Sequence, residues 1–224
     1  MADVTGEVKK RRPYDATARR RRSAATRQRI LDAARALVLE RGYRKTTIAA
    51  VAARAEVNVD TVYELVGRKP VILRELIEQA ISGTDRAVAA DERNYVKAFQ
   101  ASADPVEKLA IYARAVRDIQ GRMAPLHLAL RDASTTEPEA AEVWHQISER
   151  RAANMRRLVR DLASTGAMRP DLSVDDAADV VWATNSAELY VMLTLERGWS
   201  PERYERWLVD AWCRFLLGQP NPPA

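Results

Sequence analysis

The sequence predicts an all-α protein, and two observations lead to this prediction. Hydrophobic residues make up 47% of the 224 positions, only 8 are glycine, and no stretch alternates with the period of two that a half-buried strand requires. Apolar residues instead recur at helical spacing, in segments separated by short breaks that contain proline or glycine. We expect about nine or ten helices.

A helix is expected first over residues 26–41, because apolar side chains recur there at helical spacing before a residue that can end a helix. The apolar residues are Ile30, Ala34, Leu37 and Val38, and the terminating residue is Gly42. The two short helices that follow need this third helix for stability.

Those two short helices are expected over residues 47–53 and 59–66. Thr46 or Thr47 can cap the first, and Asn58 can cap the second. Their spacing indicates a helix-turn-helix, whose second helix would place its first turns in the major groove of DNA. The spacing alone is equally compatible with two short helices in an ordinary helical core.

The charge distribution favours DNA binding. Residues 1–74 hold 18 Lys and Arg against 8 Asp and Glu, whereas the remainder holds 18 against 23. KKRR at 9–12 and RRRR at 19–22 predict that residues 1–25 form a basic arm, disordered in the free protein, that lies on phosphates or in the minor groove. A solubilising tail is the alternative.

Cysteine and hydropathy patterns bear on the cellular setting. Cys213 is the single cysteine, so neither an intrachain disulfide nor a cysteine zinc cluster is possible. The first residues lack the apolar stretch of a signal peptide, and no apolar run of 18 residues is present. We therefore expect a cytoplasmic protein with no membrane partner, no metal and no cofactor.

The helix-turn-helix segment resembles a known family. GY at 42–43, TTIAAVAARAEVN at 46–58, TVYELV at 61–66 and a lysine at 69 together resemble the TetR (tetracycline-repressor-like) regulators, over roughly residues 26–76. The resemblance departs from the family pattern at Glu56 (commonly glycine), at Val66 (commonly aromatic), and in the acidic pair Asp60 and Glu64 near the groove.

The resemblance implies specific DNA contacts. Thr47 and Tyr63 would hold phosphates, Lys69 would grip the backbone, and residues 58–61 would read bases. With the basic arm, the candidate DNA-binding residues are Arg19, Arg20, Arg21, Arg22, Thr46, Thr47, Asn58, Val59, Asp60, Thr61, Tyr63, Arg68 and Lys69.

The rest of the chain predicts long helices with short breaks. They are expected over residues 86–101, 105–120, 123–133, 138–164, 174–196 and 201–217. We accordingly expect a DNA-binding domain over 26–70 and a larger helical domain for ligand binding and dimerisation over 71–224.

The last two expected helices carry more aliphatic and tryptophan surface than one hairpin can bury. Pairing with a second copy in a four-helix bundle, as the resemblance implies, would cover it, although packing within one chain is the alternative. The candidate dimerisation residues are Val191, Leu195, Trp207, Leu208, Ala211, Trp212 and Phe215.

The middle helices place polar side chains on apolar faces, where a buried polar group requires a partner. A small organic ligand is one such partner, and a satisfied core is the other explanation. The candidate ligand-binding residues are Tyr112, Met123, Leu126, His127, Leu130, Trp144, Ile147, Arg151, Trp182 and Asn185.

These observations predict a homodimeric, sequence-specific transcription factor that is not an enzyme, a repressor released from a palindromic operator in double-stranded DNA by a small organic ligand. Two alternatives remain. The arginine arm also suits an architectural DNA-packaging protein. Glu142, His145 and Glu149 would be the site of a metal-dependent helical enzyme, although their spacing is equally that of a solvated helix face.

Overall fold

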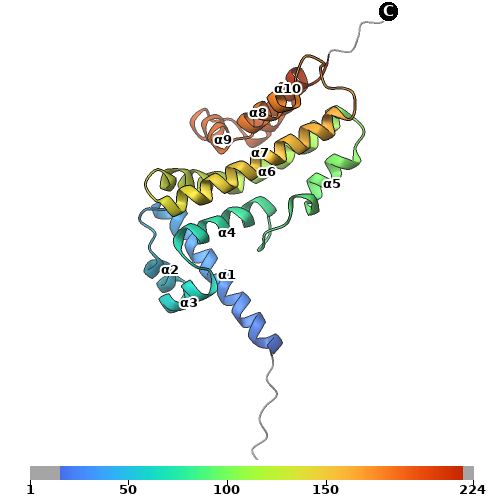
Figure 1. The fold of residues 1–224 in the computed structure, drawn as a ribbon. Coiled ribbons are helices and arrows are strands. Elements are labelled where there is room, and N and C mark those ends of the chain that lie inside the picture. Colours follow the sequence, from blue (N-terminus) through green and yellow to red (C-terminus); the bar gives the residue numbers. More distant parts are fainter. Residues whose placement is uncertain (1–15, 219–224) are drawn as a thin grey trace, which may run out of the picture.

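The fold is entirely helical, as the sequence predicts. A computed structural model describes residues 16–218, and within this range it contains ten α-helices, two short helices of other types and no strand. Figure 1 shows α6 and α7 crossing the middle of the molecule, with α1 to α5 on one side and α8 to α10 on the other.

The first helix, α1 (Ala16–Arg41), begins ten residues before the predicted start. The prediction of a disordered arm is therefore wrong for residues 16–25. Arginine and alanine are good helix formers, and no proline or glycine interrupts the segment, so the helix extends outward from its core-packed half. Residues 1–15 of the expected arm, with the KKRR run, lie outside the described residues.

The helix-turn-helix consists of α2 (Ile48–Arg54) and α3 (Val59–Leu65), and α4 (Lys69–Ser82) follows. Thr47 caps α2 as predicted, because its hydroxyl oxygen accepts a hydrogen bond from the Ala50 amide at 3.1 Å. Asn58 stands at the start of α3, but its side chain makes no capping bond, so that predicted role is wrong.

One hydrophobic core holds these short helices. Ile30 of α1, Val51 of α2, Val62 of α3 and Leu76 of α4 are each at most 1% exposed. The same core continues into α6 and α7, where it includes Leu126 and other apolar residues. The helix-turn-helix is thus stabilised by the larger helices as well as by α1.

The remaining elements are η1 (Ala90–Glu92), α5 (Asn94–Ala101), α6 (Pro105–Ser134), α7 (Pro138–Ala163), α8 (Val174–Thr184), α9 (Ala187–Val191), η2 (Met192–Glu196) and α10 (Pro201–Leu216). The helices expected over 105–120 and 123–133 are one helix, α6, with Pro125 inside it. A single proline removes only one helical bond, and both halves of α6 pack against neighbouring helices.

Two other predicted helices are shorter or broken. The helix expected over 86–101 is limited to α5, preceded by η1. The helix expected over 174–196 is interrupted at Asn185, because the Ser186 hydroxyl accepts a bond from the Leu189 amide at 3.2 Å and starts a new helix there.

Glu56 occupies the turn between α2 and α3 in the left-handed conformation, with φ of 55°. It is the one non-glycine residue with positive φ among those described. This is the position where the sequence departs from the family's glycine. A side chain in this conformation costs about 1 kcal/mol.

We predict that Glu56→Gly leaves the free energy of unfolding unchanged or raises it by up to about 1 kcal/mol, because relief of strain exceeds the added entropy of the unfolded chain. Glu56→Val should lower it by more than 1 kcal/mol, roughly, because a branched side chain tolerates positive φ least. Ala53→Gly, on the exposed side of α2, is the control and should be destabilising. Chemical denaturation measures all three; a destabilised Glu56→Gly contradicts the strain.

Candidate DNA-binding surface and interior cavity

The face of α3 opposite the core is exposed. Val62 is fully buried and anchors the helix, whereas Val59 is 39% exposed and Tyr63 is 49% exposed. Asn58 and Asp60 are also exposed, and Thr61 is half-buried. A two-turn helix that presents a phenol, an amide and an apolar side chain to solvent has the composition of a contact surface.

The two threonines before α2 have different positions. Thr46 is 2% exposed, and its hydroxyl donates to the Gly42 carbonyl at 2.9 Å, so its predicted role in DNA contact is wrong. Its side chain closes the turn between α1 and α2. Thr47 is exposed at the start of α2, and its O–H can donate to a phosphate while its oxygen caps α2.

Lys69 forms its contacts within the protein, where the start of α4 meets the start of α7. Its ammonium lies 3.9 Å from the centre of the Tyr43 ring, donates to the Tyr43 carbonyl at 3.3 Å and is 3.7 Å from Glu137 Oε1. The Tyr43 hydroxyl donates to Glu137 Oε2 at 2.9 Å, and burial together with this carboxylate raises the pKa of Tyr43.

The neighbouring cations form ion pairs with carboxylates of the same region, where α6 ends and α7 begins. Arg68 pairs with Glu139, and Arg44 Nε lies 3.2 Å from Asp132 Oδ2. The candidate phosphate contacts Arg68 and Lys69 are thus bound to carboxylates of the larger helices.

Four candidate arginines lie at the other end of the surface. Arg19, Arg20, Arg21 and Arg22 are exposed on the first turns of α1, which projects past α2 and α3 (Figure 1). Because successive helical residues are about 100° apart, their side chains surround the helix.

A cavity of about 190 Å³ lies among η1, α5, α6 and α7, and its lining includes exposed residues such as Asp91 and Arg157 as well as buried ones. Six of the predicted ligand-binding residues line it: Tyr112, Met123, His127, Ile147, Arg151 and Asn185. Four do not. Leu126 and Leu130 are fully buried in the core. Trp144 contacts His127 with a tilted ring whose centroid is 4.6 Å away, and the guanidinium of Arg151 lies over the Trp182 ring at 4.5 Å.

The side of the cavity formed by α5 and η1 was not predicted from the sequence. Asp91, Arg93, Tyr95, Val96 and Phe99 line it there, with Gln120 of α6 and Asn154 of α7 opposite. The spacing of Tyr95 and Phe99, one helical turn apart, was the available signal.

A hydrogen-bond network forms the polar wall of the cavity. Arg151 donates to Asn185 Oδ1 at 3.0 Å and 2.6 Å and to the Trp182 carbonyl. Asn185 Nδ2 donates to the Tyr112 hydroxyl at 2.7 Å, and Gln120 Nε2 donates to the Asn185 carbonyl. The break between α8 and α9 supplies most of the acceptors.

Three buried polar atoms in the described part of the chain have no hydrogen-bond partner: Gln120 Oε1, His127 Nδ1 and Trp182 Nε1. Gln120 and His127 are each 3% exposed and both line the cavity. Because unpaired buried polar atoms are costly, both residues point to a molecule that can pair with them.

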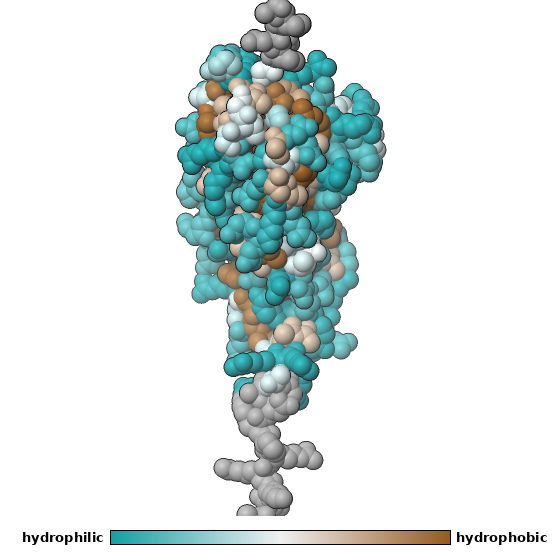
Figure 2. All heavy atoms as spheres, turned by 90° about the vertical axis from the view of Figure 1, so that its right-hand side faces the viewer, coloured by the Kyte–Doolittle hydropathy of each residue, from teal (hydrophilic) through white to brown (hydrophobic). Residues whose placement is uncertain are grey.

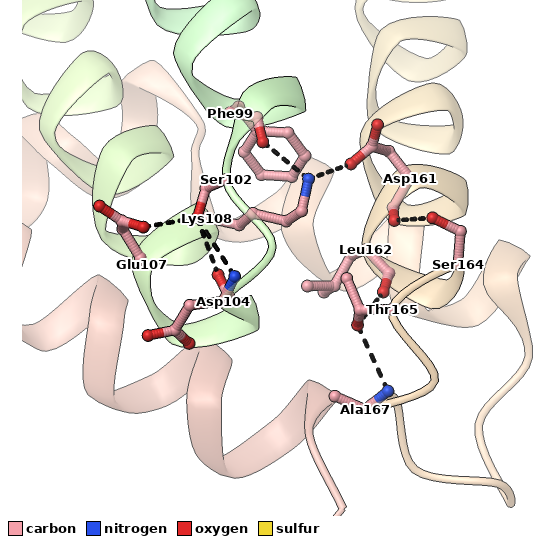
Figure 3. Close-up of polar contacts among 10 residues, drawn as sticks. All are labelled: Phe99, Ser102, Asp104, Glu107, Lys108, Asp161, Leu162, Ser164, Thr165 and Ala167. Carbon is pink, nitrogen blue, oxygen red and sulfur yellow. Dashed lines mark hydrogen bonds and ion pairs between the residues drawn. The ribbon is translucent and has the colours of Figure 1, made fainter.

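The buried Lys108 forms an ion pair with Asp161, which is partly exposed and lines the cavity (Figure 3). The Lys108 ammonium lies 2.5 Å from Asp161 Oδ1 and donates to the Phe99 carbonyl at 2.7 Å. Lys108 is 3% exposed, so its charge is neutralised by Asp161 rather than by solvent. The pair ties α5, α6 and α7 together.

The residues expected at a dimer interface divide into two groups. Leu208 and Trp212 are 0% and 1% exposed within a single chain, and Trp212 stacks on Tyr112 at 5.4 Å, so their predicted role at an interface is wrong. They complete the core under α10. Leu195 is 73% exposed, and Val191, Trp207, Ala211 and Phe215 are partly exposed.

Two further properties of the described residues bear on other functions. No group of three or more His, Cys, Asp or Glu is placed to hold a metal ion, and Glu142, His145 and Glu149 are exposed on α7. Within residues 16–218, no helix combines the length and apolar character needed to cross a membrane.

Comparison with known proteins identifies the DNA-binding segment. Residues 30–65 match the family model described as bacterial regulatory proteins, tetR family. No curated protein matches the chain.

Several solved structures share the whole fold. A transcriptional regulator from Saccharomonospora viridis in complex with choline is 20% identical, with a TM-score of 0.66 over 88% of this chain and 100% of the other. The SmeT–triclosan complex is 20% identical, with a TM-score of 0.67 over 89% and 99%. FadR from Bacillus subtilis in complex with stearoyl-CoA is 19% identical, with a TM-score of 0.66 over 82% and 96%.

The exposed α3, its helix-turn-helix setting and the larger helical domain define a DNA-binding transcriptional regulator. Its helix-turn-helix segment, residues 30–65, matches the tetR family of bacterial regulatory proteins, which confirms the resemblance found in the sequence.

We predict that Tyr63→Phe weakens binding about equally for all DNA sequences, because the exposed hydroxyl makes no bond within the described protein and is free for a phosphate. Thr61→Ala should instead change which sequences bind. Affinity measured across a randomised DNA library separates the two effects, and an unchanged affinity of Tyr63→Phe contradicts the phosphate role.

The pKa of His127 is lowered to about 4, chiefly because burial disfavours the charged imidazolium. Arg151 and Arg131 lower the pKa further, while Glu188 opposes them. The folded protein therefore binds fewer protons than the unfolded chain between about pH 6.5 and pH 4. Stability due to His127 is present above this range and lost as the pH falls through it.

We predict that the wild type loses about 3 kcal/mol more stability than His127→Leu between pH 7 and pH 4, at about 1.4 kcal/mol per pH unit. Denaturation at several pH values measures this difference. His145→Leu, on the exposed face of α7, is the matched control and should parallel the wild type. Parallel curves for the wild type and His127→Leu contradict burial of a neutral imidazole.

Proposed function

We propose that the protein is a homodimeric repressor that binds a near-palindromic operator through α3 and is released when a small organic ligand enters the cavity. The observation that carries the proposal is the pairing of an exposed tetR-family recognition helix with a cavity lined by unpartnered polar atoms. Structures of similar fold hold choline, triclosan or stearoyl-CoA, which supports a ligand site here.

In this proposal the exposed side of α3 reads DNA. Residues 58–61 contact base edges, and Thr47 and Tyr63 hold phosphates on either side. The exposed arginines on the first turns of α1 add sequence-independent attraction to the backbone. The helical form of residues 16–25 gives this part of α1 a defined direction relative to α3.

The dimer brings two copies of α3 about one DNA turn apart, near 34 Å. The interface consists of the apolar surface that one chain leaves uncovered around η2 and α10, with Leu195, Met192, Trp207 and Phe215 as its main contacts. Figure 2 shows one face of the molecule, largely hydrophilic, with apolar residues in separate patches that include the end carrying α8 to α10.

Two helices connect the cavity with the DNA surface. Lys69 begins α4, and Ile81 near its end lines the cavity. Glu137 and Glu139 lie at the start of α7, and Ile147 and Arg151 of the same helix line the cavity. A ligand that shifts either helix therefore moves residues beside α3, provided that it binds one arrangement more tightly than the other.

Selection of bound fragments from genomic DNA, followed by footprinting, tests the proposal. A repressor of this kind protects one near-palindromic site at moderate salt and requires two copies of the chain. Uniform protection of all fragments that disappears as salt rises would identify an architectural DNA-packaging protein instead.

We predict that Glu137→Gln with Glu139→Gln raises operator affinity about twofold to tenfold at low salt, because Arg68 and Lys69 are released toward phosphate. Glu142→Gln with Glu149→Gln removes the same charge from exposed positions on α7 and is the matched control. Equal effects of the two double substitutions on operator affinity would show that only the net charge of the protein determines the change. Fluorescence anisotropy of labelled operator DNA measures both.

A further inference from the structure

We infer that the cavity binds a small apolar carboxylate that carries a hydrogen-bond donor beside its carboxylate group, such as a 2-hydroxy acid with an aromatic or alkyl body. This inference rests on the proposed ligand site and specifies the chemistry of its ligand. Three features of the cavity lead to it: an arginine without an ion pair, an unpaired acceptor on a glutamine that bonds, as the arginine does, to Asn185, and apolar side chains in the rest of the lining.

Arg151 provides the anion site. Arg151 lines the cavity, and its guanidinium donates only to neutral acceptors, the Asn185 side chain and the Trp182 carbonyl. No Asp or Glu of the described chain forms an ion pair with it, and burial lowers the pKa of Arg151. A partly buried guanidinium without a counter-charge is costly, and a carboxylate can accept a charge-assisted hydrogen bond from Nη1, the nitrogen that these acceptors leave free.

The remaining charges of the wall favour an anion over a cation. Arg93 and Arg157 donate to neutral oxygens, and Asp91 is the one acidic residue that lines the cavity without an ion pair in the described structure. Arg150 is paired with Glu78, and Asp161 with Lys108. The unpaired charge around the cavity is therefore positive, which attracts anionic ligands.

Gln120 requires that the ligand also carry a hydrogen-bond donor. Its Nε2 is used by the Asn185 carbonyl, and its Oε1 is buried without a partner. Gln120 and Arg151 both bond to Asn185, so they lie at the same end of the cavity. A carboxylate cannot donate, but a hydroxyl on the adjacent carbon can donate to Gln120 Oε1 while the carboxylate pairs with Arg151.

Apolar and aromatic side chains in the cavity lining can contact an apolar body. They include Tyr95 and Phe99 of α5, Met123 of α6 and Leu158 of α7. At about 190 Å³, the cavity is somewhat larger than the roughly 150 Å³ cavity that holds benzene. One ring with a short side chain therefore fills it.

A series of probes with one common body tests the inference on the wild-type dimer. They are 2-hydroxy-3-phenylpropanoate (each enantiomer), 3-phenylpropanoate, 3-phenylpropanamide and 3-phenylpropylammonium, measured by titration calorimetry at pH 7. We expect the carboxylate to bind at least tenfold more tightly than the amide and the ammonium compound. We expect one hydroxy acid to bind several-fold more tightly than 3-phenylpropanoate.

Variants assign the effects to residues. Arg151→Met should abolish the preference for carboxylate over amide, while Arg151→Lys should retain part of it. Gln120→Met should abolish the advantage of the hydroxyl and keep the preference for carboxylate. Arg160→Met, on an exposed position of the same helix, is the matched control and should bind all probes as the wild type does. The wild-type series decides the matter even if Arg151→Met fails to fold.

Three outcomes overturn the inference: equal or tighter binding of the amide or ammonium compound, a carboxylate preference that survives in folded Arg151→Met, or no binding of any probe at millimolar concentration. The proposed function is tested separately, by operator release. Carboxylate binding that leaves DNA affinity unchanged contradicts the regulation and not the site. Release by a cationic ligand contradicts the site and not the regulation.

Discussion

The structure depends on one hydrophobic core that α1 to α4 share with α6 and α7. Helices of two turns, such as α2 and α3, cannot form in isolation, so their geometry is set by what they pack against. Val62 of α3 and Leu130 of α6 belong to this same core, although the two segments were expected in separate domains. A shift of the large helices is therefore felt at α3 through packing, in addition to any effect of the charged contacts at Tyr43 and Lys69.

Local signals in the sequence were sufficient for elements that begin or end with a specific residue. Thr47, Gly42 and Pro138 mark boundaries that the structure confirms, because a cap, a left-handed residue or a proline acts within one turn. The prediction failed in opposite directions at residues 121–122, where it expected a break, and at Asn185, where it expected a continuous helix. Packing on both sides keeps α6 continuous through its proline, and the Ser186 cap breaks a segment whose apolar spacing predicts one helix.

The candidate sites also depended on packing that local sequence signals could not predict. Spacing identified the inner faces of α6 and α7, and six residues on these helices and at Asn185 line the cavity. It could not show which helix covers each face, so Phe99 of α5 was missed and Leu126 was assigned to the cavity although it is core. Leu208 and Trp212 were assigned to a dimer for the same reason: their burial depends on α6 and α8, which are distant in sequence.

The interruption of the helix at Asn185 supplies acceptors that a continuous helix would use internally. The carbonyl groups of Trp182, Thr184 and Asn185 accept bonds from Arg151 of α7, Tyr204 of α10 and Gln120 of α6. Three helices are thus attached to four consecutive residues. Whereas most surface turns tolerate added residues, an insertion between 182 and 185 would displace all three attachments together, so chain length is constrained more tightly there than its place between two helices suggests.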